Sequence, residues 1–296
     1  MLLIKAPASS ANMGPGFDCL GLAVNIYNSF EVELSDHTCL EGVEERFNNE
    51  NNLFLQAYRK GCEAIGVSDH IHAVFHCDIP VSRGLGSSAS MICAGLTAAS
   101  ALHNDALSEG SIFQLASEME GHPDNAAPCL FGGMMASLKT ENNAFISHPM
   151  ELHEDWLYTV LIPDFEVSTE EARGILPSDY PRADAAANTA HAIIMTEALR
   201  TGSSGLLKLG ANDLIHEPYR STLIDGYETV KNITEKDTDG KMLISGSGST
   251  CILISKRPLS SYALAEIKAI PGHSWQVREV SPAFAGTEIT EASYEL

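Results

Sequence analysis

The sequence predicts a two-domain fold that mixes α-helices with β-strands. An apolar segment with strand character, residues 71–79, runs into a glycine-rich loop and then into an Ala-rich helical segment, residues 89–102. The 296 residues are enough for two domains of modest size or for one large domain. A polar segment at 141–155, which we expect to be a loop, precedes the next strand, so we place the domain boundary between residues 153 and 154.

Composition and charge narrow the class of protein. Hydrophobic residues make up 44% of the chain and charged residues 19%, as in ordinary globular proteins. The formal net charge of −21 argues against nucleic acid or an anionic membrane as the main partner, although a small basic pocket for ATP remains compatible with it. No apolar segment reaches the roughly 18 residues of a membrane span, and no signal peptide is recognised. The seven cysteines form no C-x-x-C pair, which indicates reduced thiols and a cytoplasmic protein.

Apolar spacing predicts the other elements in chain order. Helical spacing that ends at Gly66 predicts a helix over 52–66, and a Ser108 cap predicts a second helix that ends at Glu120. Thr169 is expected to cap a short helix, and an Ala-rich run predicts a long one over 183–200. A last helix is expected over 260–270. Apolar runs predict strands over 2–7, 28–34, 131–138, 156–163, 241–245, 251–255 and 275–280.

The glycine-rich loop is the main candidate site, and it reads PVSRGLGSSAS. Gly84 and Gly86 let the backbone turn sharply and approach a ligand. Ser87 and Ser88 are good caps for the helix that follows, whose free N–H groups and dipole favour an anion. With Arg83 as a nearby cation, the loop is predicted to hold nucleotide phosphates. Its members are Pro80, Val81, Ser82, Arg83, Gly84, Leu85, Gly86, Ser87, Ser88, Ala89 and Ser90.

Three alternatives compete with a nucleotide phosphate loop at these residues. A P-loop is excluded because no Lys follows Gly86. Residues 84–89 fit the G-x-G-x-x-A pattern of dinucleotide-binding loops, but 80–83 intervene after the strand and no clear second strand follows the helix. A plain Ser/Gly helix cap without any ligand is the remaining alternative.

Two further loops carry polar side chains that could take part in binding or catalysis. Residues 9–21 form a bent, glycine-rich loop with Asn12 and Asp18, whose side chains could equally bond their own backbone in a turn. The segment EGHPDNAAP ends a predicted helix, where the dipole disfavours acidic groups, so a metal ion would compensate them. A polar turn between helices is the alternative there. The polar residues of this EGHPDNAAP segment are Glu120, His122, Asp124 and Asn125.

The chain resembles a known family in four separated stretches. PASSANMGPGFDCLGLA, PVSRGLGSSAS, EGHPDNAAPCLFGG and ISGSGSTC resemble, in order, motifs of the homoserine kinase family within the GHMP kinase superfamily. STEEAR and HEPYR are similar to that family's substrate-binding arginine segments. The resemblance implies a two-domain α+β fold. An N-terminal ribosomal-protein-like α/β domain would span 1–153, and a C-terminal ferredoxin-like domain would span 154–296.

The resemblance also implies a reaction, in which ATP and Mg²⁺ phosphorylate the hydroxyl of L-homoserine to give O-phospho-L-homoserine, a step toward threonine. Ser88 and Glu120 would reach the metal ion, and the glycine loop would hold the phosphates. Asp18 would take the substrate ammonium, and Arg173 and Arg220 its carboxylate, for which the planar guanidinium is well suited. Facing homoserine or its reacting hydroxyl, the resemblance places Asn12, Asp18, His122, Asp124 and Asn125.

Several alternatives stay open at this point. Glu118 competes with Glu120 for the metal ion, and a catalytic base falls on Asp124, on Asn125 or on no residue, since an Asn cannot act as a base. The GSGST segment, 246–250, departs from the usual final loop and has a plain tight turn as its alternative. The other functions considered are a GHMP kinase for another alcohol such as mevalonate, a dehydrogenase and a non-catalytic binding protein. A homodimer is one expectation for the assembly, which the sequence leaves open.

Overall fold

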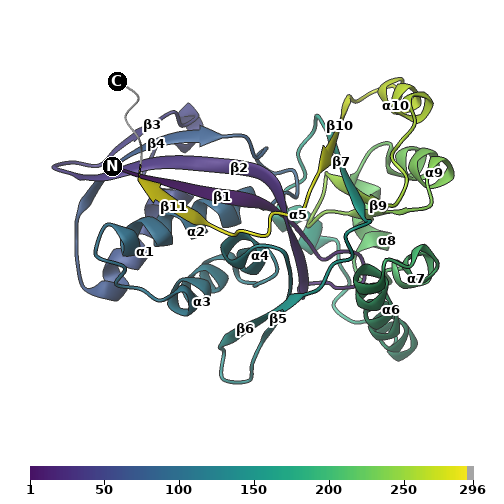
Figure 1. The fold of residues 1–296 in the computed structure, drawn as a ribbon, viewed down its shortest axis with the longest axis horizontal. Coiled ribbons are helices and arrows are strands. Elements are labelled where there is room, and N and C mark those ends of the chain that lie inside the picture. Colours follow the sequence, from purple (N-terminus) through teal and green to yellow (C-terminus); the bar gives the residue numbers. More distant parts are fainter. Residues whose placement is uncertain (292–296) are drawn as a thin grey trace.

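The computed structural model describes residues 1–291, which form two β-sheets with helices packed against them (Figure 1). The first sheet has seven strands, ordered β11-β1-β2-β4-β3, with β5 and β6 joined to β2. Helices α1 to α4 lie on one face of it (Figure 1). Its strands are β1 (Leu2–Ala11), β2 (Leu20–Ser35), β3 (Cys39–Glu41), β4 (His70–Cys77), β5 (Met134–Lys139), β6 (Phe145–Met150) and β11 (Glu288–Glu291). The helices are η1 (Glu45–Phe47), α1 (Leu53–Ile65), α2 (Ser87–Ala101), α3 (Glu109–Glu120) and α4 (Ala126–Phe131).

The second sheet has four antiparallel strands in the order β10-β7-β9-β8. Helices α9 and α10 pack against it, and α6 and α7 form a separate pair beside it. Its strands are β7 (Leu157–Pro163), β8 (Lys241–Ile244), β9 (Cys251–Ser255) and β10 (Trp275–Val280). The helices are α5 (Thr169–Gly174), α6 (Arg182–Thr201), α7 (Ser204–Gly210), α8 (Glu217–Arg220), η2 (Ser221–Leu223), α9 (Tyr227–Asp237) and α10 (Ser261–Lys268).

Strand direction confirms the α+β prediction and disfavours the dehydrogenase. Every pairing in the first sheet is antiparallel except that of β3 with β4. A dinucleotide-binding domain needs a mostly parallel sheet built from βαβ units. The G-x-G-x-x-A match at 84–89 is therefore coincidental.

Two hydrophobic clusters position the parts that carry the site. Between the first sheet and its helices, the rings of Phe30, Phe54 and Phe75 contact one another with centroids 4.9–5.2 Å apart. A second cluster joins the two sheets, because it contains Leu22 and Val24 of β2 together with Val160 of β7. The two sheets therefore share buried apolar surface.

Local signals explain most element boundaries. Helix α1 begins after Asn52, whose side chain accepts from the Leu55 N–H, and ends at Gly66 in the left-handed conformation. Ser108 likewise caps α3. Strands β1 and β2 are longer than the predicted 2–7 and 28–34. Each takes up one end of the segment 9–21, which was predicted to be a loop throughout.

Three local predictions were wrong. The segment 141–155 is not a loop throughout: β6 occupies Phe145–Met150 as an edge strand on which only Phe145 is buried, which leaves little apolar signal. Helix α2 is capped by Gly86 and not by Ser87 or Ser88. Helix α5 is capped by the Ser168 hydroxyl, so Thr169 is already its first residue.

The chain crosses back between the two halves at its C-terminal end. Strand β11 pairs with β1 in the first sheet, although the four strands that precede it in the chain belong to the second (Figure 1). The division at residue 153 stays a prediction. Among the described helices none is both long and apolar enough to span a bilayer.

Candidate active site

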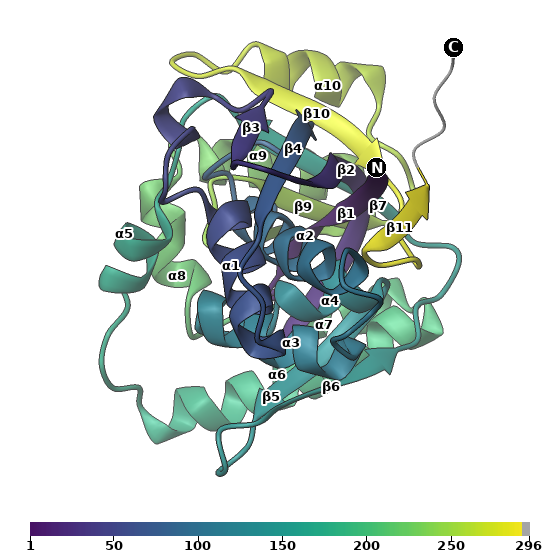
Figure 2. The same cartoon turned by 90° about the vertical axis from the view of Figure 1, so that its left-hand side faces the viewer.

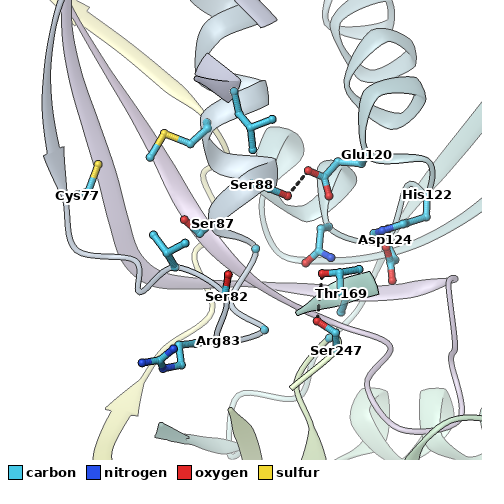
Figure 3. Close-up of a pocket in the computed structure, with 18 of the residues that line it drawn as sticks. Cys77, Ser82, Arg83, Ser87, Ser88, Glu120, His122, Asp124, Thr169 and Ser247 are labelled. Carbon is cyan, nitrogen blue, oxygen red and sulfur yellow. Dashed lines mark hydrogen bonds and ion pairs between the residues drawn. The ribbon is translucent and has the colours of Figure 1, made fainter. Parts of the chain in front are cut away.

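A cavity of about 400 Å³ lies where loops from both sheets meet (Figure 3). Its walls come from the β1–β2 loop, the glycine loop, the α3–α4 turn, α5, α8 and the β8–β9 loop. The structure thus brings together most of the residues singled out in the sequence. Those that line it are Asn12, Asp18, Val81, Ser82, Arg83, Gly84, Gly86, Ser87, Ser88, Glu120, His122, Asp124, Asn125, Arg173 and Arg220.

Four predicted members of the glycine loop do not line the cavity: Pro80, Leu85, Ala89 and Ser90. Leu85, Ala89 and Ser90 are fully buried in the interior. Their side chains anchor the loop, because a short β-to-α connection must bury part of itself to stay in one conformation. Any contact with a ligand from these positions would come from the backbone.

The two loop glycines are required by the protein's own packing. Gly84 has φ +73°, and a Cβ there would lie 2.2 Å from the carbonyl oxygen of Ser245. Gly86 has φ +66°, and its Cβ would lie 2.0 Å from Ser9 Oγ. Because no side chain caps α2, its first N–H groups stay available at the cavity wall.

Ser88 and Glu120 form one side of the cavity (Figure 3). Ser88, in the first turn of α2, donates a hydrogen bond to Glu120, the last residue of α3. Burial raises the pKa of Glu120, and the Ser88 bond only partly opposes this. The competing Glu118 is exposed and does not line the cavity. A hydroxyl and a carboxylate that share a wall are hard oxygen ligands, so the residues present fit Mg²⁺.

His122 and Asp124 lie beside this pair in the turn between α3 and α4 (Figure 3). His122 Nδ1 bonds the carboxylate of Asp124, which is only 2% exposed. Burial lowers the pKa of His122, but the bond and charge of Asp124 outweigh it, and the pKa is raised. Oxygen and nitrogen atoms of Asp18, His122 and Asp124 lie within 4.8 Å of one another. Asn125 is held in place by a 2.8 Å bond from Ser9 Oγ to its Oδ1.

Two arginines from the second half complete the cavity. Arg173 donates two hydrogen bonds, of 2.8 and 3.2 Å, to the carboxylate of Asp18. Arg220 is only 2% exposed and donates from Nε to Ala172 O at 3.1 Å and from Nη1 to Gly246 O at 2.9 Å. Within residues 1–291 its Nη2 makes no hydrogen bond. The site therefore holds a half-buried pair of opposite charges and one buried guanidinium with a spare donor.

Comparison with known proteins identifies the family. The family model of the GHMP kinases N terminal domain matches residues 52–133. The chain is 38% identical over 293 residues to the homoserine kinase of Clostridium botulinum (strain Okra / Type B1), with 98% of each chain covered. This chain belongs to the homoserine kinase family of GHMP kinases.

Superposition on solved structures supports the same family assignment. A homoserine kinase from Cytophaga hutchinsonii superposes with a TM-score of 0.85 at 27% identity, covering 98% of this chain and 97% of that one. The mevalonate kinase of Methanococcus jannaschii superposes with a TM-score of 0.71 at 14% identity, covering 95% and 98%. The second likeness shows a shared fold and no more.

One end of the cavity was not predicted from the sequence. Residues that follow β3 and begin α1 line this end together with Met91 of α2; the apolar side chains among them, Val43, Phe47, Leu53 and Met91, form an apolar wall beside the polar Glu44, Asn51 and Asn52. The segment 42–52 is polar apart from Val43 and Phe47, so apolar spacing gave no signal for it. The GSGST segment also reaches the cavity, through Gly246 and Ser247, and Ser247 Oγ lies 3.4 Å from Thr169 Oγ1 (Figure 3).

Proposed function

We propose that this chain transfers the terminal phosphoryl group of ATP to the hydroxyl of L-homoserine, giving ADP and O-phospho-L-homoserine. The observation that carries the proposal is the Asp18–Arg173 pair, which lines the same cavity as the free N–H groups of α2. Homoserine is a zwitterion, so its two charges can replace the ion pair between these residues: its ammonium would bind Asp18 and its carboxylate would bind Arg173. Nη2 of Arg220 offers a second donor to the carboxylate.

The remaining roles follow from position. The ATP phosphates would lie on the glycine loop and the first turn of α2, where backbone donors and the helix dipole favour anions. The adenine would occupy the apolar wall at Val43, Phe47, Leu53 and Met91. Mg²⁺ bound at Ser88 and Glu120 would supply charge neutralisation for phosphoryl transfer.

Positioning alone is proposed to activate the substrate hydroxyl. The carboxylate of Asp124 is already bonded to His122, and Asn125 Oδ1 accepts from Ser9, so neither is poised as an unpartnered base. Asn12 has a scaffolding role: its Nδ2 donates to Gly246 O at 2.8 Å and its Oδ1 accepts the Asp18 N–H at 3.0 Å. This fixes the loop that carries Asp18.

Domain division, location and assembly concern the whole chain. We keep a division into a phosphate-binding domain, 1–153, and a second domain, 154–296, with β11 returning to the first. All seven cysteines are free thiols, which is consistent with a cytoplasmic location. A homodimer stays a prediction.

An ADP-release assay across homoserine, mevalonate, galactose and shikimate tests the function. Homoserine should give the highest kcat/KM, because it is the only one of the four with both an ammonium and a carboxylate for Asp18 and Arg173. Mevalonate has a carboxylate but no ammonium, so it would leave Asp18 unpaired. Faster turnover of any other alcohol, or no turnover of homoserine, would refute the proposal.

A further inference from the structure

A second group of metal-ligating side chains lies away from the cavity, on the first sheet. Its members come from three adjacent strands: Glu33 on β2, His72 on β4, and Cys39 and Glu41 on β3. In the register of the sheet both Glu33 and Cys39 pair with His72, so the three lie in one row across the strands. Glu41 follows Cys39 by two residues and therefore faces the same side.

The side chains converge on a point beside the His72 ring. Ligand atoms of Cys39, Glu41 and His72 all lie within 4.8 Å of one another. His72 Nε2 is 2.8 Å from Glu41 Oε1, and Nδ1 on the other side of the ring is 3.4 Å from Glu33 Oε1. A tetrahedral ion with bonds of about 2.0–2.3 Å keeps its ligand atoms roughly 3.3–3.8 Å apart. Cys39 and His72 are partly exposed and Glu41 is exposed, so their side chains have room to adjust to that spacing.

We propose that Cys39, Glu41 and His72 bind a divalent transition-metal ion such as Zn²⁺. A thiolate, an imidazole and a carboxylate are the donor set that selects such an ion over Mg²⁺ or Ca²⁺. Nε2 of His72 is the ligand atom, because Nδ1–H then donates to the Glu33 carboxylate. This outer carboxylate orients the ring, as in many zinc sites. Solvent completes the coordination at the exposed face.

A histidine–glutamate ion pair at the surface is the simpler explanation, and the same strands contain one. His76 Nε2 lies 3.3 Å from Glu31 Oε1, and within residues 1–291 this pair belongs to no group of three metal-ligating side chains. What distinguishes His72 is the thiol of Cys39 on a third strand. The His76 pair is therefore a matched control on the same strands.

The site has a consequence for the cavity. Strand β3 is an edge strand of three residues, and the chain runs from it directly into Gly42, Val43 and Phe47, which line the apolar wall. An ion that ties β3 to β4 would restrict this wall. Metal binding on the outer surface is thus linked to order at one end of the cavity.

Titration of the reduced full-length protein with Co²⁺ tests the site, because a cobalt–thiolate bond gives a charge-transfer absorption band. We expect one equivalent with this band, displaced by Zn²⁺. Cys39→Ser should abolish the band, and His72→Gln should weaken binding at least 10-fold. The band and the affinity should both be unchanged in the control variants His76→Gln, Cys19→Ser and Cys77→Ser.

Three results would overturn the proposal: no stoichiometric binding, a band that survives Cys39→Ser, or equal losses in His72→Gln and His76→Gln. The second cluster of possible ligands, Asp18, His122 and Asp124, contains no thiol and cannot give the band. Hydrogen exchange over residues 39–47 should slow with Zn²⁺ in the parent and not in Cys39→Ser. Unchanged exchange in the parent would reject the link to the cavity wall.

Discussion

Glu120 is a carboxylate in a cavity wall whose hydrogen-bond donor is the Ser88 hydroxyl. Because burial already raises the pKa of Glu120, a cation in the cavity would relieve an unfavourable environment. Ser88→Ala and Glu120→Gln should each lower kcat/KM by roughly 10- to 100-fold and shift the Mg²⁺ titration to higher concentration, with an unchanged fold. Glu118→Gln is the control on the exposed side of α3. An unchanged rate and Mg²⁺ titration in Ser88→Ala would remove Ser88 from the metal site.

Asp124 is the residue on which the question of a base depends. If it removed the hydroxyl proton, Asp124→Asn should lower kcat by about 100-fold or more. We expect a smaller loss that falls mainly on the KM for homoserine, because the carboxylate is already engaged by His122. The measurement is steady-state kinetics together with a homoserine-binding assay. A large fall in kcat with binding and fold preserved would assign Asp124 as the base.

Glu217 gives a pH dependence of stability. It is 6% exposed, its Oε1 accepts the Ile244 N–H at 2.7 Å, and burial raises its pKa from 4.5 to about 7. A carboxyl whose pKa is raised on folding contributes stability at pH values below its pKa in the unfolded state. This stability is lost as the pH rises through its pKa in the folded state. Relative to Glu217→Gln, the free energy of unfolding of the parent should fall by about 3 kcal/mol between pH 4.5 and 7. The free energies of unfolding are measured by denaturant titration across this pH range. Parallel pH profiles for the parent and Glu217→Gln would contradict the prediction.

At the scale of elements, the sequence predicted what local signals determine. Helix α1 was found from its spacing and from Gly66, and α3 from Ser108, because caps and spacing act within a few residues. Strands β3 and β11 have three and four residues and little or no buried surface, so their existence depends on partners far away in the chain.

The same distinction applies to the site. The glycine loop and the α3–α4 turn were found because each gathers its residues within a short segment. The full burial of Arg220 could not be predicted, since its partners Ala172 and Gly246 lie 48 and 26 residues away. The apolar wall was missed for the same reason: it forms only when 42–53 meets α2.

The short helices α5 and α8 lie side by side (Figure 2). They are joined by a hydrogen bond that Arg220 of α8 donates to the carbonyl oxygen of Ala172 in α5. Arg173→Ala should cost about 2–4 kcal/mol, or roughly 30- to 1000-fold in kcat/KM for homoserine, with a much smaller change in the KM for ATP. Arg220→Ala should do the same and also lower the melting temperature, since two carbonyl oxygens lose their donor. Lys at either position should recover only part of the loss.

The control for these arginines is Arg200→Ala, which removes an exposed ion pair with Glu197 and should change little. A second control is the substrate analogue 3-aminopropan-1-ol, which lacks the carboxylate. It should be a poor substrate of the parent but should lose less than homoserine when Arg173 is removed. Equal losses for the two substrates would show that the arginines do not bind the carboxylate.

At the scale of the whole molecule, the two sheets share one buried cluster. Leu22, Val24 and Ile26 of β2 are at most 1% exposed and belong to the same cluster as Val160 and Ile254 of the second sheet. Burying a side chain of this size contributes about 1.5–3 kcal/mol. Uncovering several of them would cancel a typical total stability of about 5–15 kcal/mol.

The full chain should therefore unfold in a single thermal transition by calorimetry, and residues 1–153 expressed alone should bind a hydrophobic dye and melt without cooperativity. Residues 154–296 alone should behave likewise, because Val160 and Ile254 lose the β2 side chains and β11 loses its partner strand β1. In the proposed site MgATP would bind at α2 of the first half and homoserine at Arg173 and Arg220 of the second, so adding both should raise the temperature of the single transition without splitting it. Two resolved transitions, or a cooperative melt of either half, would show that the halves are independent folding units joined only by the cavity.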